Sequence, residues 1–133
     1  MSFKQVLSQM QAVRSFQRAL AKGCLAHAYI FHGSEGVGKA LFAKEASKAL
    51  LCQEGGEDAC ERCTHCLRVE SRTHPDLYWL TLGKEKKFIA IDDIRNLQVF
   101  AALKPFEARR RVFIIQDADR MNEEASNSLL KTL

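Results

Sequence analysis

The glycine-rich segment Gly-Ser-Glu-Gly-Val-Gly-Lys-Ala at residues 33–40 constrains the fold of this chain more than any other feature. It fits the phosphate-binding pattern of Gly, four residues, Gly and Lys, and it lies between an apolar run and a helical pattern, as the motif requires. Backbone N–H groups of such a turn point at a phosphate, and a lysine adds a full positive charge. We therefore expect a phosphate loop made by Gly33, Gly36, Val37, Gly38, Lys39 and Ala40. The alternative is a strand-to-helix turn without a ligand.

Two positions that hold magnesium in such loops carry unsuitable residues. Ala40 replaces the Ser or Thr whose hydroxyl binds Mg²⁺. The apolar run 112–115 would end in a metal-binding Asp, but Gln116 follows it, and a neutral amide is a poor ligand for a hard cation. We predict weak or absent ATP or ADP binding, no Mg²⁺, no intrinsic ATPase activity and no catalytic residue. The alternative is that Asp117 takes over metal binding.

Apolar periodicity and turn residues predict alternating helices and strands. Helices are expected from about residue 7 to 20 with Ser8 as a possible cap, at 39–51, from Asp92 or Asp93 to 103, and from 122 to 133; strands are expected at 28–31, 76–82 and 111–115. This alternation predicts an α/β fold with a parallel sheet. The last helical pattern has no Gly, Asn or Pro stop, so we expect a C-terminally truncated chain.

Composition narrows the class of protein. The chain has 133 residues, of which 47% are apolar, which suits one domain with a buried core. Its apolar runs fall short of the ~18 residues that a membrane span needs, and its start lacks a secretory signal. We expect a soluble cytoplasmic protein whose five cysteines are reduced. The net charge of +4 permits a nucleic-acid partner without requiring one.

Four cysteines are spaced as C-x7-C-x2-C-x2-C: Cys52, Cys60, Cys63 and Cys66. Two-residue gaps let neighbouring thiolates converge on one ion, so this spacing predicts a structural Zn²⁺ site with four protein ligands. The alternative, four thiols scattered in a core, conflicts with the polar residues between them. We expect His65 to face solvent rather than the metal, Cys24 to be a half-buried thiol, and His27, His32 and His74 to be structural.

The chain resembles the first domain of the bacterial clamp-loader subunits of DNA polymerase III. The matching parts are the phosphate loop, the four cysteines, and residues 27–31, 74–76, 91–95 and 110–133. The resemblance covers nearly the whole chain. It implies an AAA+ P-loop NTPase fold, with residues 1–133 as the N-terminal part of a nucleotide-binding domain and a zinc-binding insertion at about 52–66. The function that it implies is DNA replication, in which the loader places a sliding clamp on primed DNA.

The resemblance also implies partners: other loader subunits (gamma/tau and delta), the sliding clamp and primed DNA. Ala40 and Gln116 favour the delta prime branch, which often lacks a working ATP site, over the ATP-hydrolysing gamma/tau branch. A free-standing zinc module that binds nucleic acid is a third interpretation. It is disfavoured because the charge balance of the cysteine segment repels phosphate. The segment carries four acidic residues, Glu54, Glu57, Asp58 and Glu61, against two basic ones, Arg62 and Arg68.

Arg95 resembles a family position that faces the DNA backbone; the alternative is an ordinary solvated helix face. We expect Arg109, Arg110 and Arg111 to form a solvated turn. The sensor strand, arginine finger, lid and collar of the family are absent from this sequence. The family also places its first strand between strands that follow Leu133, so we expect unpaired sheet edges and marginal stability.

Overall fold

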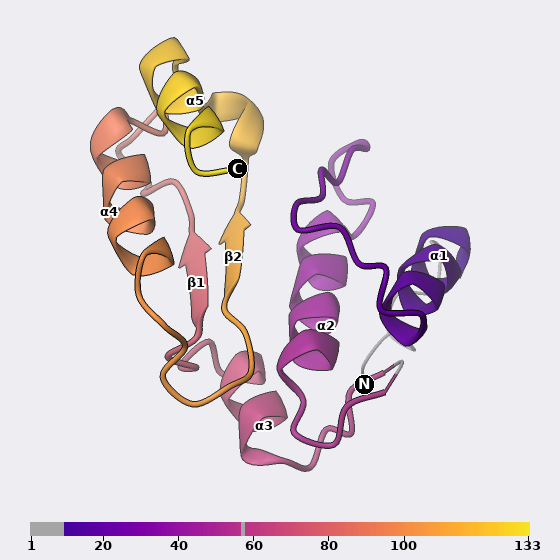
Figure 1. Cartoon of the computed structure of the whole chain (residues 1–133). Coiled ribbons are helices and arrows are strands. Elements are labelled where there is room, and N and C mark those ends of the chain that lie inside the picture. Colours follow the sequence, from indigo (N-terminus) through magenta and orange to yellow (C-terminus); the bar gives the residue numbers. More distant parts are fainter. Residues whose placement is uncertain (1–9, 57) are drawn as a thin grey trace.

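The computed structural model describes residues 10–56 and 58–133. Its helices are α1 (Met10–Ala21), α2 (Lys39–Leu51), α3 (Thr64–Glu70), α4 (Ile91–Ala101), α5 (Glu123–Leu130) and the short 3₁₀ helix η2 (Ala118–Arg120), and its strands are β1 (Leu77–Leu80) and β2 (Val112–Ile115) (Figure 1). The expected α/β class is confirmed. Within the described residues, no helix has the length and apolar character that a membrane crossing requires.

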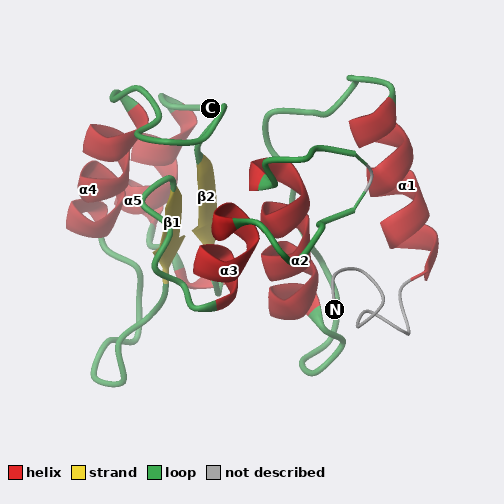
Figure 2. Ribbon diagram, turned by 90° about the horizontal axis from the view of Figure 1, so that it is seen from below, coloured by secondary structure: helices red, strands yellow, loops and turns green. Residues whose placement is uncertain are grey.

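β1 and β2 pair in parallel, with Leu77 opposite Val112 and Leu80 opposite Ile115. Parallel neighbours need a crossover connection, and α4 supplies it, so β1, α4 and β2 form a βαβ unit. The sheet of the described residues consists of these two strands. α4 contacts β1 and α2 contacts β2, so the two helices lie toward opposite edges of the sheet (Figures 1 and 2). The expected parallel sheet is thereby confirmed.

In the described part of the chain, buried apolar side chains form two separate clusters. The first joins α1 to α2 and contains Val13, Phe16, Phe42, Ala46 and Ala49. The second joins the sheet to α4 and α5, and its buried members are Ile89, Ile94 and Ala125. Helix α2, which follows the glycine-rich segment, therefore packs in a different cluster from most of the βαβ unit. α3 packs against α2 and, seen from below, lies between α2 and the strands (Figure 2).

The expectation of a strand at residues 28–31 is wrong, because the segment pairs with no strand of the described chain. A strand is defined by its ladder of hydrogen bonds, and apolar composition alone cannot supply a partner. Ile30 is 94% exposed. The neighbouring rings instead pack on the helices: Tyr29 lies against Phe16, and Phe31 lies against Phe42.

Two helix boundaries also differ from expectation. α5 ends at Leu130 instead of running to Leu133, because the last N–H groups fold back in a tight turn, with Thr132 donating to the Leu129 carbonyl. α4 begins after Ala90, not after Asp92 or Asp93. The Asp93 carboxylate accepts the Ala90 N–H at 3.0 Å, so this acid stabilises the helix start from within its first turn. The expected cap at Ser8 lies outside the described residues.

Candidate metal centre and phosphate loop

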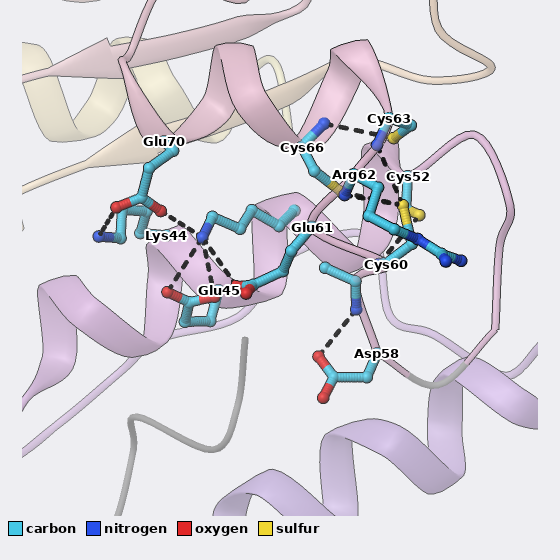
Figure 3. A network of polar contacts seen from close by, with 12 residues as sticks. Lys44, Glu45, Cys52, Asp58, Cys60, Glu61, Arg62, Cys63, Cys66 and Glu70 are labelled. Carbon is cyan, nitrogen blue, oxygen red and sulfur yellow. Dashed lines mark hydrogen bonds and ion pairs between the residues drawn. The ribbon is translucent and has the colours of Figure 1, made fainter. Parts of the chain in front are cut away.

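The four predicted cysteines come together at the junction of α2 and α3. Cys52 caps the C-terminus of α2, Cys63 caps the N-terminus of α3, Cys66 lies in the first turn of α3, and Cys60 lies in the loop between the helices. Their four sulfur atoms all lie within 4.8 Å of one another. In Figure 3 the four side chains gather at one point beside the start of α3. The sequence spacing therefore identified a real spatial cluster.

This cluster has the dimensions and donors of a zinc site. Zn–S bonds of about 2.3 Å in a tetrahedron place sulfur atoms about 3.8 Å apart, and the Cys60 and Cys66 sulfurs are 4.0 Å apart. Backbone N–H groups also point at the sulfurs: Arg62 and Cys63 donate to Cys60 Sγ at 3.4 and 3.3 Å. Such bonds orient and stabilise metal-bound thiolates. The residues present thus fit a Zn²⁺ ion.

Left-handed backbone conformations allow the loop to close. Gly55 and Gly56 have φ values of 72° and 104°, which glycine adopts without steric cost. Glu61 has a φ of 62°, a conformation that costs a residue with a side chain about 1–3 kcal/mol. Glu61 immediately follows Cys60, and its turn is the one that aims the N–H groups of Arg62 and Cys63 at the Cys60 sulfur.

The thiols differ in their electrostatic surroundings. Burial acts to raise the pKa of Cys63, but hydrogen bonds from the backbone N–H groups of Gln53 and Cys66 outweigh it and lower the pKa to about 7. Burial raises the pKa of Cys66 well above its ordinary value. A metal ligand must be a thiolate, so a cation that binds here displaces a proton more easily from Cys63 than from Cys66.

Sequence reasoning missed α3, which contains the ligand Cys66 and is capped by the ligand Cys63. The helix has only seven residues, and its start is set by the Cys63 sulfur, which accepts the Cys66 N–H at 3.4 Å. Ser, Thr, Asp and Asn are the usual cap residues, so a cysteine gave no helix signal. His65 on α3 lies outside the cysteine cluster, as expected, but it is only partly exposed, because its Nδ1 lies 2.7 Å from Nε2 of His74.

A buried carboxylate fixes the loop that leads into β2. Asp76 is 1% exposed and accepts the backbone N–H groups of Phe106, Glu107 and Ala108 at 2.6 to 2.8 Å. Arg111 Nε lies 3.7 Å from the same carboxylate. The expected solvated turn is therefore wrong for Arg111, whose guanidinium also lies over the rings of aromatic neighbours: Phe100, Phe106 and Phe113.

The glycine-rich segment forms a partly exposed turn that leads into α2. Gly36 and Gly38 have φ values of 78° and 96°, in the left-handed region that favours glycine. Lys39 Nζ donates to the Gly33 carbonyl at 2.7 Å, so the lysine closes back over the turn. A methyl group at Gly33 would lie 3.0 Å from Val37 Cγ1, so the turn is also tightly packed there.

Neither Ala40 nor Gln116 offers a suitable ligand for a catalytic magnesium ion. Ala40 is the second residue of α2 and has no oxygen in its side chain. The Gln116 amide oxygen accepts the Trp79 indole N–H at 2.9 Å. Asp117 is exposed and turns away from the strand direction with a φ of 56° to begin η2. The residues present therefore do not fit a Mg²⁺ ion held in the way typical of phosphate loops.

Other residues singled out in the sequence lie apart from the cysteine cluster. The Arg95 side chain on α4 is 64% exposed, and its nearest acid is Asp92 at 3.5 Å. Arg109 and Arg110 are exposed, as expected. Cys24 is exposed instead of half-buried, because it follows α1 after Gly23 ends the helix.

Comparison with known proteins agrees with the resemblance. A family model described as "DNA polymerase III, delta subunit" matches residues 8–133. The chain is 36% identical to DNA polymerase III subunit delta' of Bacillus subtilis over 125 residues, which are 94% of this chain and 37% of that protein. Identity to subunit delta' of Pseudomonas aeruginosa is also 36%, over 81% of this chain and 33% of that protein.

Gamma/tau subunits match as well. Identity to DNA polymerase III subunit gamma/tau of Mycoplasma pneumoniae is 30% over 98% of this chain and 19% of that protein. The chain thus spans about a third of the length of the delta' relatives and a smaller share of this gamma/tau relative. The chain belongs to the DNA polymerase III delta-subunit family, and its relatives include proteins named as delta' and gamma/tau subunits of DNA polymerase III.

Proposed function

We propose that this member of the family is a delta'-type subunit of the clamp loader and that it does not hydrolyse ATP. Its residues form the first part of an AAA+ domain, and its phosphate loop is degenerate. The subunit acts in DNA replication with the gamma/tau and delta subunits, the sliding clamp and primed DNA. Its cysteine centre holds one structural Zn²⁺ ion.

One observation carries the proposal: the glycine turn is kept while both magnesium positions are unsuitable. Ala40 has no ligand atom, and the oxygen of Gln116 accepts a hydrogen bond from Trp79. Phosphoryl transfer depends on a metal ion that bridges the phosphates, so a loop without metal ligands retains at most weak anion binding. The 36% identity to two delta' subunits supports the same branch.

The second candidate is an ATP-hydrolysing gamma/tau-type subunit. The 30% identity to a gamma/tau subunit over nearly the whole chain favours it. In that case Asp117 would supply the metal contact that Gln116 lacks.

ATP turnover by the full-length protein, with and without Mg²⁺, distinguishes the two candidates. We expect turnover at the level of a buffer blank, and no further decrease in the variant Lys39→Ala. Turnover that needs Mg²⁺ and is abolished by both Lys39→Ala and Asp117→Asn would establish the gamma/tau-type activity instead.

The zinc assignment has an independent test. Full-length protein purified without added metal is expected to contain one equivalent of zinc, and Cys63→Ser is expected to lower the content by more than half, because tetrahedral thiolate sites need all four ligands. The matched control is Cys24→Ser, which removes an exposed thiol outside the cluster and leaves the content unchanged. A wild-type zinc content near zero would contradict the assignment.

Arg95 is proposed to contact the DNA backbone in the assembled loader. Its exposed position on α4 leaves the guanidinium available to a phosphate. We expect Arg95→Ala to weaken primer-template binding and to reduce its dependence on salt, since each phosphate contact releases counterions. Arg14→Ala, an exposed arginine on α1, is the matched control. Equal affinities for wild type and Arg95→Ala would contradict this role.

A further inference from the structure

A buried lysine lies one helical turn before the first cysteine of the cluster. Lys48 is on α2, four residues before Cys52, and is only 3% exposed. Its ammonium group makes ion pairs with three carboxylates: Glu45 at 3.4 Å, Glu61 at 3.2 Å, and Glu70. Figure 3 shows these three carboxylates pointing toward a common centre beside the cysteines. We call this arrangement the Lys48 bridge.

The bridge joins α2 to both ends of the segment that carries the other three thiols. Glu61 lies between Cys60 and Cys63, in the loop whose backbone points N–H groups at the Cys60 sulfur. Glu70 is the last residue of α3, one turn after Cys66. Lys48 thus holds the start of this segment through Glu61 and its end through Glu70.

The groups of the Lys48 bridge are charged, and the ammonium group and the carboxylates stabilise each other's charged forms. Burial acts to lower the pKa of Lys48, but the hydrogen bond with Glu70 and the nearby carboxylates outweigh it and raise the pKa. The hydrogen bonds from Lys48 and Lys44 lower the pKa of Glu70 to about 2. Glu45 is fully buried, and its Oε2 accepts no hydrogen bond in the described structure. Removing the lysine would leave this acid buried without its cation, which is strongly unfavourable.

We propose that Lys48 is a positioning residue for the metal centre: it holds Glu61 and Glu70, and with them the thiols of Cys60, Cys63 and Cys66, against the end of α2. Cys52 is already fixed as the C-cap of that helix, so the bridge brings the other ligands to it. The ion pairs of Lys48 and the bound metal ion then both hold residues 60–70 against α2, so each makes the contacts of the other more favourable. This inference rests on the proposed zinc site.

Zinc affinity of the full-length protein tests the role of Lys48. We would measure it by competition with a chelator for wild type, Lys48→Met and Lys44→Met. Residues that orient metal ligands change metal affinity by about 10–100-fold when replaced, so Lys48→Met is expected to weaken zinc binding by about tenfold or more. Lys48→Arg, which keeps the charge, is expected to recover most of the loss.

Lys44→Met is the matched control because Lys44 is on the same helix and pairs with Glu70 at 3.0 Å but, among the described residues, with none that lies between the cysteines. It is expected to change the zinc Kd by less than about twofold to threefold. Glu61→Gln removes the contact to Lys48 at a partly exposed loop position, so its protein can be measured even where Lys48→Met fails to fold. We expect it to weaken zinc binding and to leave the thiolate-to-Co²⁺ absorption bands at saturation unchanged.

The outcomes separate this inference from the metal assignment. Wild type that takes up no zinc would overturn both. Wild type that binds zinc with an affinity shared by Lys48→Met and Glu61→Gln would overturn the positioning role alone. Equal losses in Lys44→Met and Lys48→Met would also overturn it, because the effect would then come from Glu70 and α3 stability, without the loop contact to Glu61.

Discussion

Asp76 shows how one residue organises a distant segment. Its buried carboxylate accepts three backbone N–H groups about thirty residues later in the chain. Burial acts to raise its pKa, but these three hydrogen bonds outweigh it, so the pKa is lowered. A carboxylate that satisfies buried donors cannot be replaced without leaving them unpaired.

We therefore expect Asp76→Asn to lower the free energy of unfolding by about 3 kcal/mol, because the amide presents N–H groups to N–H donors. Denaturant unfolding of the full-length protein measures this. Asp92→Asn is the control, since Asp92 is 85% exposed beside Arg95 and its loss should change stability very little. Similar stabilities for the two variants would contradict the role given to Asp76.

His74 gives a pH-dependent prediction at the same scale. Its Nδ1 accepts the Asp76 N–H at 2.9 Å, and its Nε2 faces His65 at 2.7 Å, so the neutral ring with a proton on Nε2 fits this site. Burial and the neighbouring His65 lower the pKa of His74 below 6.5. A lowered pKa means that the neutral ring's stabilisation is complete above pH 6.5 and is lost as the pH falls through the lowered value.

NMR titration of the imidazole protons should place the His74 pKa below 6.5. The free energy of unfolding should be constant from pH 7.5 to 6.5 and then fall, by at most about 1.4 kcal/mol per pH unit. His74→Phe should be less stable at neutral pH and should show a smaller slope below pH 6.5. An unchanged slope in this variant would assign the pH dependence to other groups.

At the scale of elements, α5 depends on Asn122, the residue that caps its N-terminus. The Asn122 side chain accepts the Ala125 N–H at 2.9 Å and so satisfies one of the free donors of the helix start. Ala125 itself is fully buried in the cluster that joins α5 to α4. The cap therefore fixes where this helix begins to pack.

Asn122→Ala is expected to destabilise the protein by about 1 kcal/mol, and Asn122→Asp by much less because a carboxylate also caps a helix. Thermal unfolding of both variants checks this. Equal losses would show that the side-chain acceptor does not matter at this position.

The sequence predicted the elements that have a local cause. The periodicity of residues 39–51 identified α2 with its observed bounds, and the short apolar runs at 76–82 and 111–115 found β1 and β2 within a few residues. The strand expected at 28–31 failed because pairing is a long-range property. α3 was missed because seven residues carry little periodicity, and because its cap is a cysteine.

The same distinction applies to the candidate site. Cysteine spacing is local, so the cluster at Cys52, Cys60, Cys63 and Cys66 could be predicted. The Lys48 bridge could not, because Glu61 and Glu70 reach the lysine only through the packing of α3 on α2. The hydrogen bonds of Asp76 to residues 106–108 could not be predicted either, because they join segments about thirty residues apart in the sequence.

At the scale of the whole molecule, the two apolar clusters divide the chain into parts with different dependence on the metal. The proposed zinc ion lies between α2 and α3, and α2 also carries Phe42, Ala46 and Ala49 of the cluster that joins it to α1. The cluster of Ile89, Ile94 and Ala125 contains no cysteine. Because stability is not uniform across a protein, metal removal should open the first region before the second.

Hydrogen exchange of the full-length protein, before and after removal of zinc by a chelator, tests this division. We expect amides of the 53–70 segment to exchange at least tenfold faster without zinc, because Cys60, Cys63 and Cys66 lose their common ligand. The second half of α2 should follow more weakly, since Cys52 caps it. Amides of β2 and α4 should change by less than about threefold, because their packing needs no metal.

Cys24→Ser should respond to the chelator as wild type does, since Cys24 lies outside the cluster. A uniform increase across both regions would instead mean that the chain unfolds as one unit when zinc leaves, and that the two apolar clusters stabilise each other.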